Sequence, residues 1–130
     1  MTEDHHGDEE LFLALISHWV KAHQGLVKLL QELPVPIQVP TTLGADEEVM
    51  AMVLDAMGNA AEIVHDQPVD PHVSGIIAQA ILFWLAAYDV TAGYEERRKP
   101  WTLAAAHMLI QQCVVMTVLA LTHLLGLDPE

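Results

Sequence analysis

Cysteine is nearly absent from this 130-residue sequence, which contains one, Cys113. A single cysteine excludes an intrachain disulfide and a zinc site built from several thiolates. Within the apolar run "LIQQCVVM" the thiol is expected to be buried and inert. The N-terminal "MTEDHHGDEE" is acidic and lacks the basic start and apolar core of a secretory signal. We therefore expect a cytoplasmic protein.

Basic residues are also scarce, because five Lys and Arg stand against 18 Asp and Glu, for a formal net charge of -13. Binding to phosphate backbones or anionic lipid needs clustered Lys and Arg. The one basic run, residues 97–99, precedes Pro100 and suits the negative end of a helix dipole. Direct nucleic-acid binding is therefore not expected, whereas an acidic surface favours a basic protein partner.

Aromatic residues make up only 5% of the chain, although 52% of it is hydrophobic. The interior must consist mainly of Leu, Ile, Val, Met and Ala, a mixture that favours helices over sheets. A chain of this length fits one domain with a hydrophobic core of its own. We expect a single domain over residues 1–130.

Hydrophobic spacing and helix start signals predict four helices, over residues 8–33, 45–66, 71–99 and 100–126. The first contains apolar residues at alternating steps of four and three, interrupted by one histidine: Phe12, Ile16, Trp19, His23, Leu26, Leu30 and Leu33. Residues 1–8 are predicted to be a disordered acidic tail, and the prolines in 34–44 predict an extended connection. The fold expected is an all-α, up-down four-helix bundle.

The last two predicted helices are apolar on nearly every side, which is typical of helices that are central in an assembly or shared with another subunit. We therefore expect a homodimer whose contact includes one of them. The pair could also be read as a membrane hairpin with a basic turn. Polar residues inside the spans argue against that reading: Gln79, Asp89, His107, Gln111, Gln112 and His123.

The stretch "AEIVHDQPVDPHV" contains a Glu-x-x-His step, Glu62 to His65, of the kind used in di-metal bundles. A second such step is missing, and Glu62 points away from the predicted core, so no core metal site is expected. The stretch is better explained as a joint, in which Asp70 caps the helix that begins at Pro71. A surface site made by His65, Asp66 and His72 is the remaining metal candidate.

His23 lies in a row where Leu or Ile would be more stabilising. Counting residues along the predicted helices places it near the height of Gln79 and His123. Such a layer could be a hydrogen-bond network that fixes the register of the helices, or it could line a small-molecule pocket. The three residues are the ligand-binding candidates, and the sequence identifies no catalytic residue and no cofactor.

These observations favour a non-enzymatic cytoplasmic protein that acts by protein–protein interaction, in a regulatory or inhibitory role, with its acidic surface towards a basic partner. The alternative is a bundle that binds a small molecule, or a small enzyme, that uses the layer of His23, Gln79 and His123.

Overall fold

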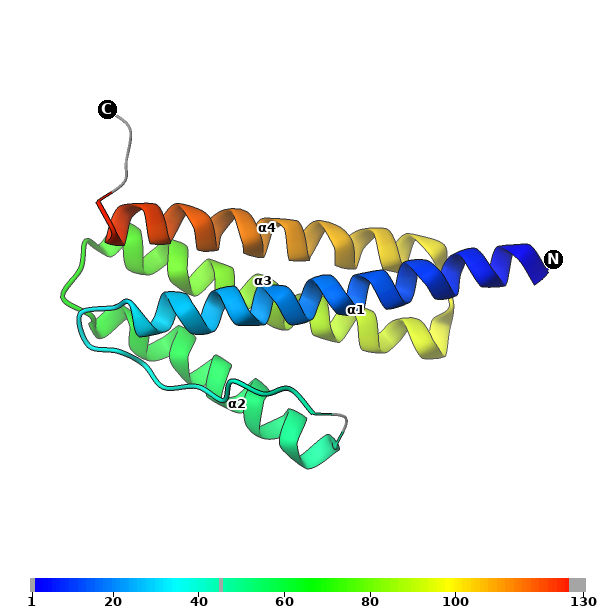
Figure 1. Ribbon diagram of the computed structural model, residues 1–130, viewed down its shortest axis with the longest axis horizontal. Coiled ribbons are helices and arrows are strands. Elements are labelled where there is room, and N and C mark those ends of the chain that lie inside the picture. The colour runs from blue at the N-terminus through cyan, green and yellow to red at the C-terminus, as the bar shows by residue number, and fades with distance from the viewer. Residues whose placement is uncertain (1, 45, 127–130) are drawn as a thin grey trace.

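The chain forms four helices that pack against one another in the computed structural model, which describes residues 2–44 and 46–126, with the backbone alone for residues 2–8, 95 and 97 (Figure 1). The helices are α1 (Thr2–Gln31), α2 (Glu47–Ile63), α3 (Pro71–Arg97) and α4 (Pro100–Leu124), and a short 3₁₀ turn, Val64–Asp66, follows α2. No strand occurs in the described residues. The predicted all-α four-helix bundle is confirmed. The predicted tail overlaps the start of α1, but the side chains of residues 1–8 lie outside the described part of the chain.

Local signals set the helix ends. The side chain of Asp46 accepts a hydrogen bond from the Glu48 N–H at 2.8 Å, and that of Asp70 accepts one from the His72 N–H at the same distance. Both are N-cap contacts, which satisfy amide groups that the helix leaves free. Arg98 ends α3 in a left-handed conformation, with φ 52°. Pro100 then occupies the first turn of α4, where its missing N–H costs nothing.

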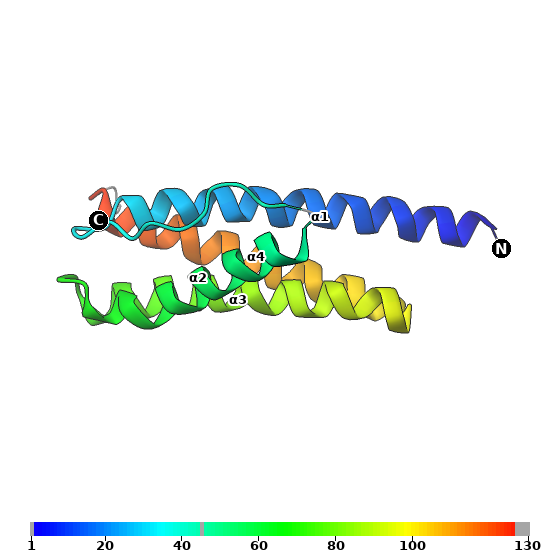
Figure 2. The same cartoon turned by 90° about the horizontal axis from the view of Figure 1, so that it is seen from below.

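The connection between α1 and α2 runs back along the bundle rather than across its end (Figures 1 and 2). As a result α1, α2 and α4 run in one direction and α3 in the other. The alternation expected of an up-down bundle therefore holds from α2 to α4 but not between α1 and α2. The prolines keep the connection extended, and its Ile37 and Val39 side chains are buried in the core.

Two polar contacts hold this connection in place. The Gln67 side chain accepts a hydrogen bond from the Val35 N–H at 3.0 Å and donates one to the Val35 carbonyl at 2.7 Å. Further along, His23 Nε2 lies 3.0 Å from the Pro40 carbonyl oxygen. Because a carbonyl can only accept, Nε2 must carry the proton. The joint between α2 and α3 and the middle of α1 thus each bind the connection.

The core is centred on two tryptophans, Trp19 of α1 and Trp84 of α3. Their rings stack with centroids 4.3 Å apart and an interplanar angle of 7°. Each indole N–H donates to the backbone carbonyl of the other residue at 3.1 Å. Buried indoles need a partner for this N–H, and here the two supply each other. The pair fixes the height of α1 against α3, while α4 packs on both of them and α2 packs on α3.

Candidate functional site

The three ligand-binding candidates do not meet in the structure. His23 is only 1% exposed and its ring lies 5.5 Å from the Trp84 ring, but its hydrogen-bond partner is Pro40. Gln79 is exposed on α3. His123 lies near the start of α3, where its ring is 6.4 Å from that of His72. No shared layer forms among them, and a binding role for any of them stays a prediction.

Burial lowers the pKa of His23 from its usual value of 6.5, and the hydrogen bond to Pro40 opposes this only in part. A neutral imidazole can donate from one ring nitrogen and so satisfy the connection without a buried charge. His23 is therefore a structural contact between α1 and the connection.

The candidate surface metal ligands His65, Asp66 and His72 are all exposed, as is Glu62. Within residues 9–44, 46–94, 96 and 98–126, no group of three or more His, Cys, Asp or Glu side chains lies close enough to bind a metal ion. The residues of this joint with a structural role are Asp70, which caps α3, and Gln67, which binds the connection.

Helix α4 has two rows of residues on opposite sides, each at alternating steps of three and four. The inner row packs in the bundle: Leu103, Ala106, Ile110, Cys113, Thr117, Ala120 and Leu124. The outer row, here named the outer seam, lies on the exposed side of α4 and continues one residue past its end: Trp101, Ala104, Met108, Gln111, Val115, Val118, Thr122 and Leu125. Every member of the outer seam is exposed except the half-buried Thr122. Such spacing is typical of a helix that packs against a further helix.

The inner row contains the only cysteine. Burial raises the pKa of the Cys113 thiol to about 11, and the nearby Thr117 hydroxyl offsets this only in part. The thiol is fully buried and protonated at neutral pH, so it is a packing residue rather than a nucleophile.

Helix α4 contains no Asp, Glu, Lys or Arg over its 25 residues. In the described part of the chain, residues Pro71–Tyr94 and Pro100–Leu124 are long and apolar enough to cross a membrane by length and composition. Half of the apolar window in the first segment is buried inside the protein, against a third in the second. A core helix of a soluble protein meets the same criterion, so α4 is distinguished chiefly by how much of it is left uncovered.

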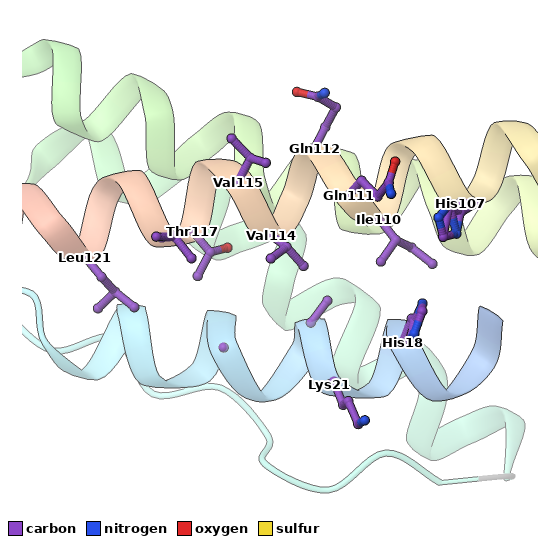
Figure 3. Close-up of a pocket in the computed structure, with 13 residues that line it drawn as sticks. His18, Lys21, His107, Ile110, Gln111, Gln112, Val114, Val115, Thr117 and Leu121 are labelled. Atoms are coloured by element: carbon purple, nitrogen blue, oxygen red, sulfur yellow. The ribbon is translucent and has the colours of Figure 1, made fainter. Parts of the chain in front are cut away.

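An open groove of about 730 Å³ lies between α1 and α4 (Figure 3). Ile110, Val114, Thr117 and Leu121 point from α4 towards α1 along it. The facing side of α1 is made of small residues, Ala22 and Gly25. A methyl group added at Gly25 would lie 3.6 Å from Thr117 Cγ2, which is an ordinary van der Waals contact, so alanine would also fit at this position.

One end of the groove is polar. His18 of α1 and His107 of α4 face each other across it, with ring centroids 5.9 Å apart (Figure 3). Lys21 also lines the groove, although its side chain is turned away from α4 in Figure 3. His18 could not be identified as a site residue from the sequence, because it belongs to the exposed face of α1, where no residue pattern sets it apart. The one indication of this polar end in the sequence was His107, which lies one turn before the glutamines of α4.

The chain was compared with protein-family models, curated proteins and solved structures. No family model matches it, and neither a curated protein nor a solved structure is significantly similar to it.

Proposed function

We propose that this protein is a non-enzymatic helical interaction protein that self-associates through the outer seam of α4. The single observation that carries the proposal is an uncharged helix of 25 residues with an exposed row at heptad spacing, in a chain of net charge -13. Contiguous exposed apolar side chains of this kind usually mark an interaction site. The outer seam then resembles an interface with its partner helix removed.

The charge distribution favours a second copy as the occupant of this seam. A basic partner would gain nothing from α4, because no carboxylate lies on it. Two copies of an acidic chain repel each other wherever their carboxylates approach. The uncharged α4 is the helix on which that repulsion is smallest, and a two-fold contact would place the same seam on both sides.

Gln111 is the one amide in the outer seam. A polar residue at such a position costs some stability in coiled coils but selects one register and one number of helices. In the proposed dimer Gln111 has this role, because its amide can bond to polar groups of the partner helix and disfavours slipped pairings.

The acidic face of α2 remains free in this arrangement. Its charged residues are all acidic and exposed: Glu47, Glu48, Asp55 and Glu62, with the cap Asp46 before them. We propose that this face meets a basic protein partner, on which the dimer acts as a regulator or inhibitor. An oligolysine peptide is a suitable probe. Glu47→Lys with Glu48→Lys should weaken its binding more than Glu9→Lys with Glu10→Lys, and equal effects would remove α2 from the proposal.

The self-association is tested by two matched substitutions. Met108 of the outer seam and Met52 of α2 are 65% and 67% exposed in the single chain. Sedimentation at about 10 µM, a concentration at which a specific dimer is populated, should give twice the chain mass of 14.3 kDa for the wild type. Met108→Glu should sediment as a monomer and Met52→Glu as a dimer. A monomeric wild type, or loss of the dimer by both variants, would refute the proposal.

A further inference from the structure

We infer that the groove between α1 and α4 binds a long-chain carboxylate, with the alkyl chain along α4 and the carboxylate between His18 and His107. This inference goes beyond self-association, because the groove is formed within one chain. Gln111, Val115 and Val118 of the outer seam also lie along the groove, so a second copy on the seam would border it.

The electrostatics of the groove are opposite to those of the protein. The chain carries 18 acidic residues. None of those whose side chains the structure describes lines the groove, whereas His18, Lys21 and His107 do. A carboxylate at this end would meet imidazole N–H donors and no like charge at contact distance. A cationic ligand would find no counter-charge there. The chemistry of the polar end therefore selects an anionic head group.

The rest of the groove is suited to a chain rather than to a compact ligand. From His107 to Leu121 it follows α4 over 14 residue steps, or about 21 Å at the rise of an α-helix. Along this path the side chains that point towards α1 are aliphatic except for Thr117, whose hydroxyl is already bonded to the Cys113 carbonyl at 2.7 Å. Its volume of about 730 Å³ is within the range of ligand sites. The Gln111 and Gln112 amides also line the groove, but both side chains are exposed to water, so an alkyl chain can cover the aliphatic side chains without burying them.

The test is calorimetric titration of the intact protein with dodecanoate, dodecanol and acetate. Dodecanoate should bind with a dissociation constant below about 1 mM, dodecanol at least about tenfold more weakly, and acetate not measurably. Equal binding of dodecanol would show that apolar contact alone operates and would overturn the inference, as would no binding of dodecanoate.

Two surface substitutions locate the site. His107→Glu places a carboxylate at the polar end and should weaken dodecanoate binding about tenfold, while His65→Glu, on the exposed joint, should leave it unchanged. Val114→Asn removes apolar lining and should weaken both amphiphiles, while Val49→Asn on α2 should weaken neither. Circular dichroism checks that each variant is folded. Unchanged binding in both groove variants would overturn the inference, and so would a dissociation constant that rises with protein concentration, because a second copy would then occupy the groove.

Discussion

Replacing His23 by leucine should change how the stability of the protein depends on pH more than it changes stability itself. The side chain is 1% exposed, and its one hydrogen bond is to the Pro40 carbonyl. Losing that bond costs about 0.5 to 1.5 kcal/mol, and the more apolar leucine offsets part of it. Because Pro40 is only half-buried, water can replace the lost donor. At about pH 8, where imidazoles are neutral, the variant should lie within about 1 kcal/mol of the wild type.

At acidic pH the unfolding free energies of the wild type and of His23→Leu should differ. Burial lowers the pKa of His23 in the folded state, so the unfolded chain takes up the proton first as the pH falls through 6.5. The wild type then loses up to about 1.4 kcal/mol of unfolding free energy per pH unit, until the folded-state pKa is reached. The leucine variant has no proton to bind at this position. Its stability relative to the wild type should therefore rise between about pH 7.5 and about pH 5.5.

Urea denaturation at fixed protein concentration, followed by tryptophan fluorescence at several pH values, measures this difference. His65→Gln is the control, because His65 is exposed and its removal should leave the pH dependence as it is. If the curves of the wild type and His23→Leu stay parallel over this range, the assignment of His23 as a buried neutral donor is wrong.

Three further predictions concern stability and reactivity. Iodoacetamide should leave Cys113 unmodified in the native protein and modify it in urea, because the thiol is buried with a pKa of about 11; rapid native labelling would contradict this. Asp70→Ala should cost about 1 kcal/mol in urea denaturation through loss of the cap, whereas Asp66→Ala should change stability by less than about 0.5 kcal/mol. Trp84→Phe should cost about 2 to 4 kcal/mol, since it removes both the stacking area and the indole donor to Trp19; a loss below about 1 kcal/mol would show that the pair is not central to the core.

Helix positions could be predicted from the sequence because their signals are local. Asp70 before Pro71, and Pro100 after the basic run, each mark an end that backbone chemistry enforces. The path of the connection could not be predicted in the same way. A segment of this length can cross the end of a bundle or run back along it, and only its contacts decide. The available sign was Ile37 and Val39, two apolar residues two positions apart in an extended segment, which place both side chains on one face.

The candidate layer shows where counting along helices succeeds and fails. The height predicted for His23 was close, because its ring lies beside Trp84. The face predicted for Gln79 did not agree with the structure, because Gln79 lies on the same helix as Trp84 but is exposed to solvent. His123 was displaced further, because α4 runs in the direction of α1 and ends beside the start of α3. The outer seam could not be predicted, because it belongs to a helix that is apolar on nearly every side. Only the structure shows which row of that helix is buried and which is exposed.

The most direct test of the account is the reactivity of a thiol placed on the outer seam. Met108→Cys and Met52→Cys put thiols at two positions that are 65% and 67% exposed in the single chain, while Cys113 stays buried. If a second copy covers α4, the thiol at position 108 should react with a maleimide at least about tenfold more slowly than that at position 52 when the protein is concentrated, and the two rates should converge on dilution. Equal rates at every concentration would contradict the account, and slow reaction at position 108 only when lipid vesicles are added would assign the seam to a membrane.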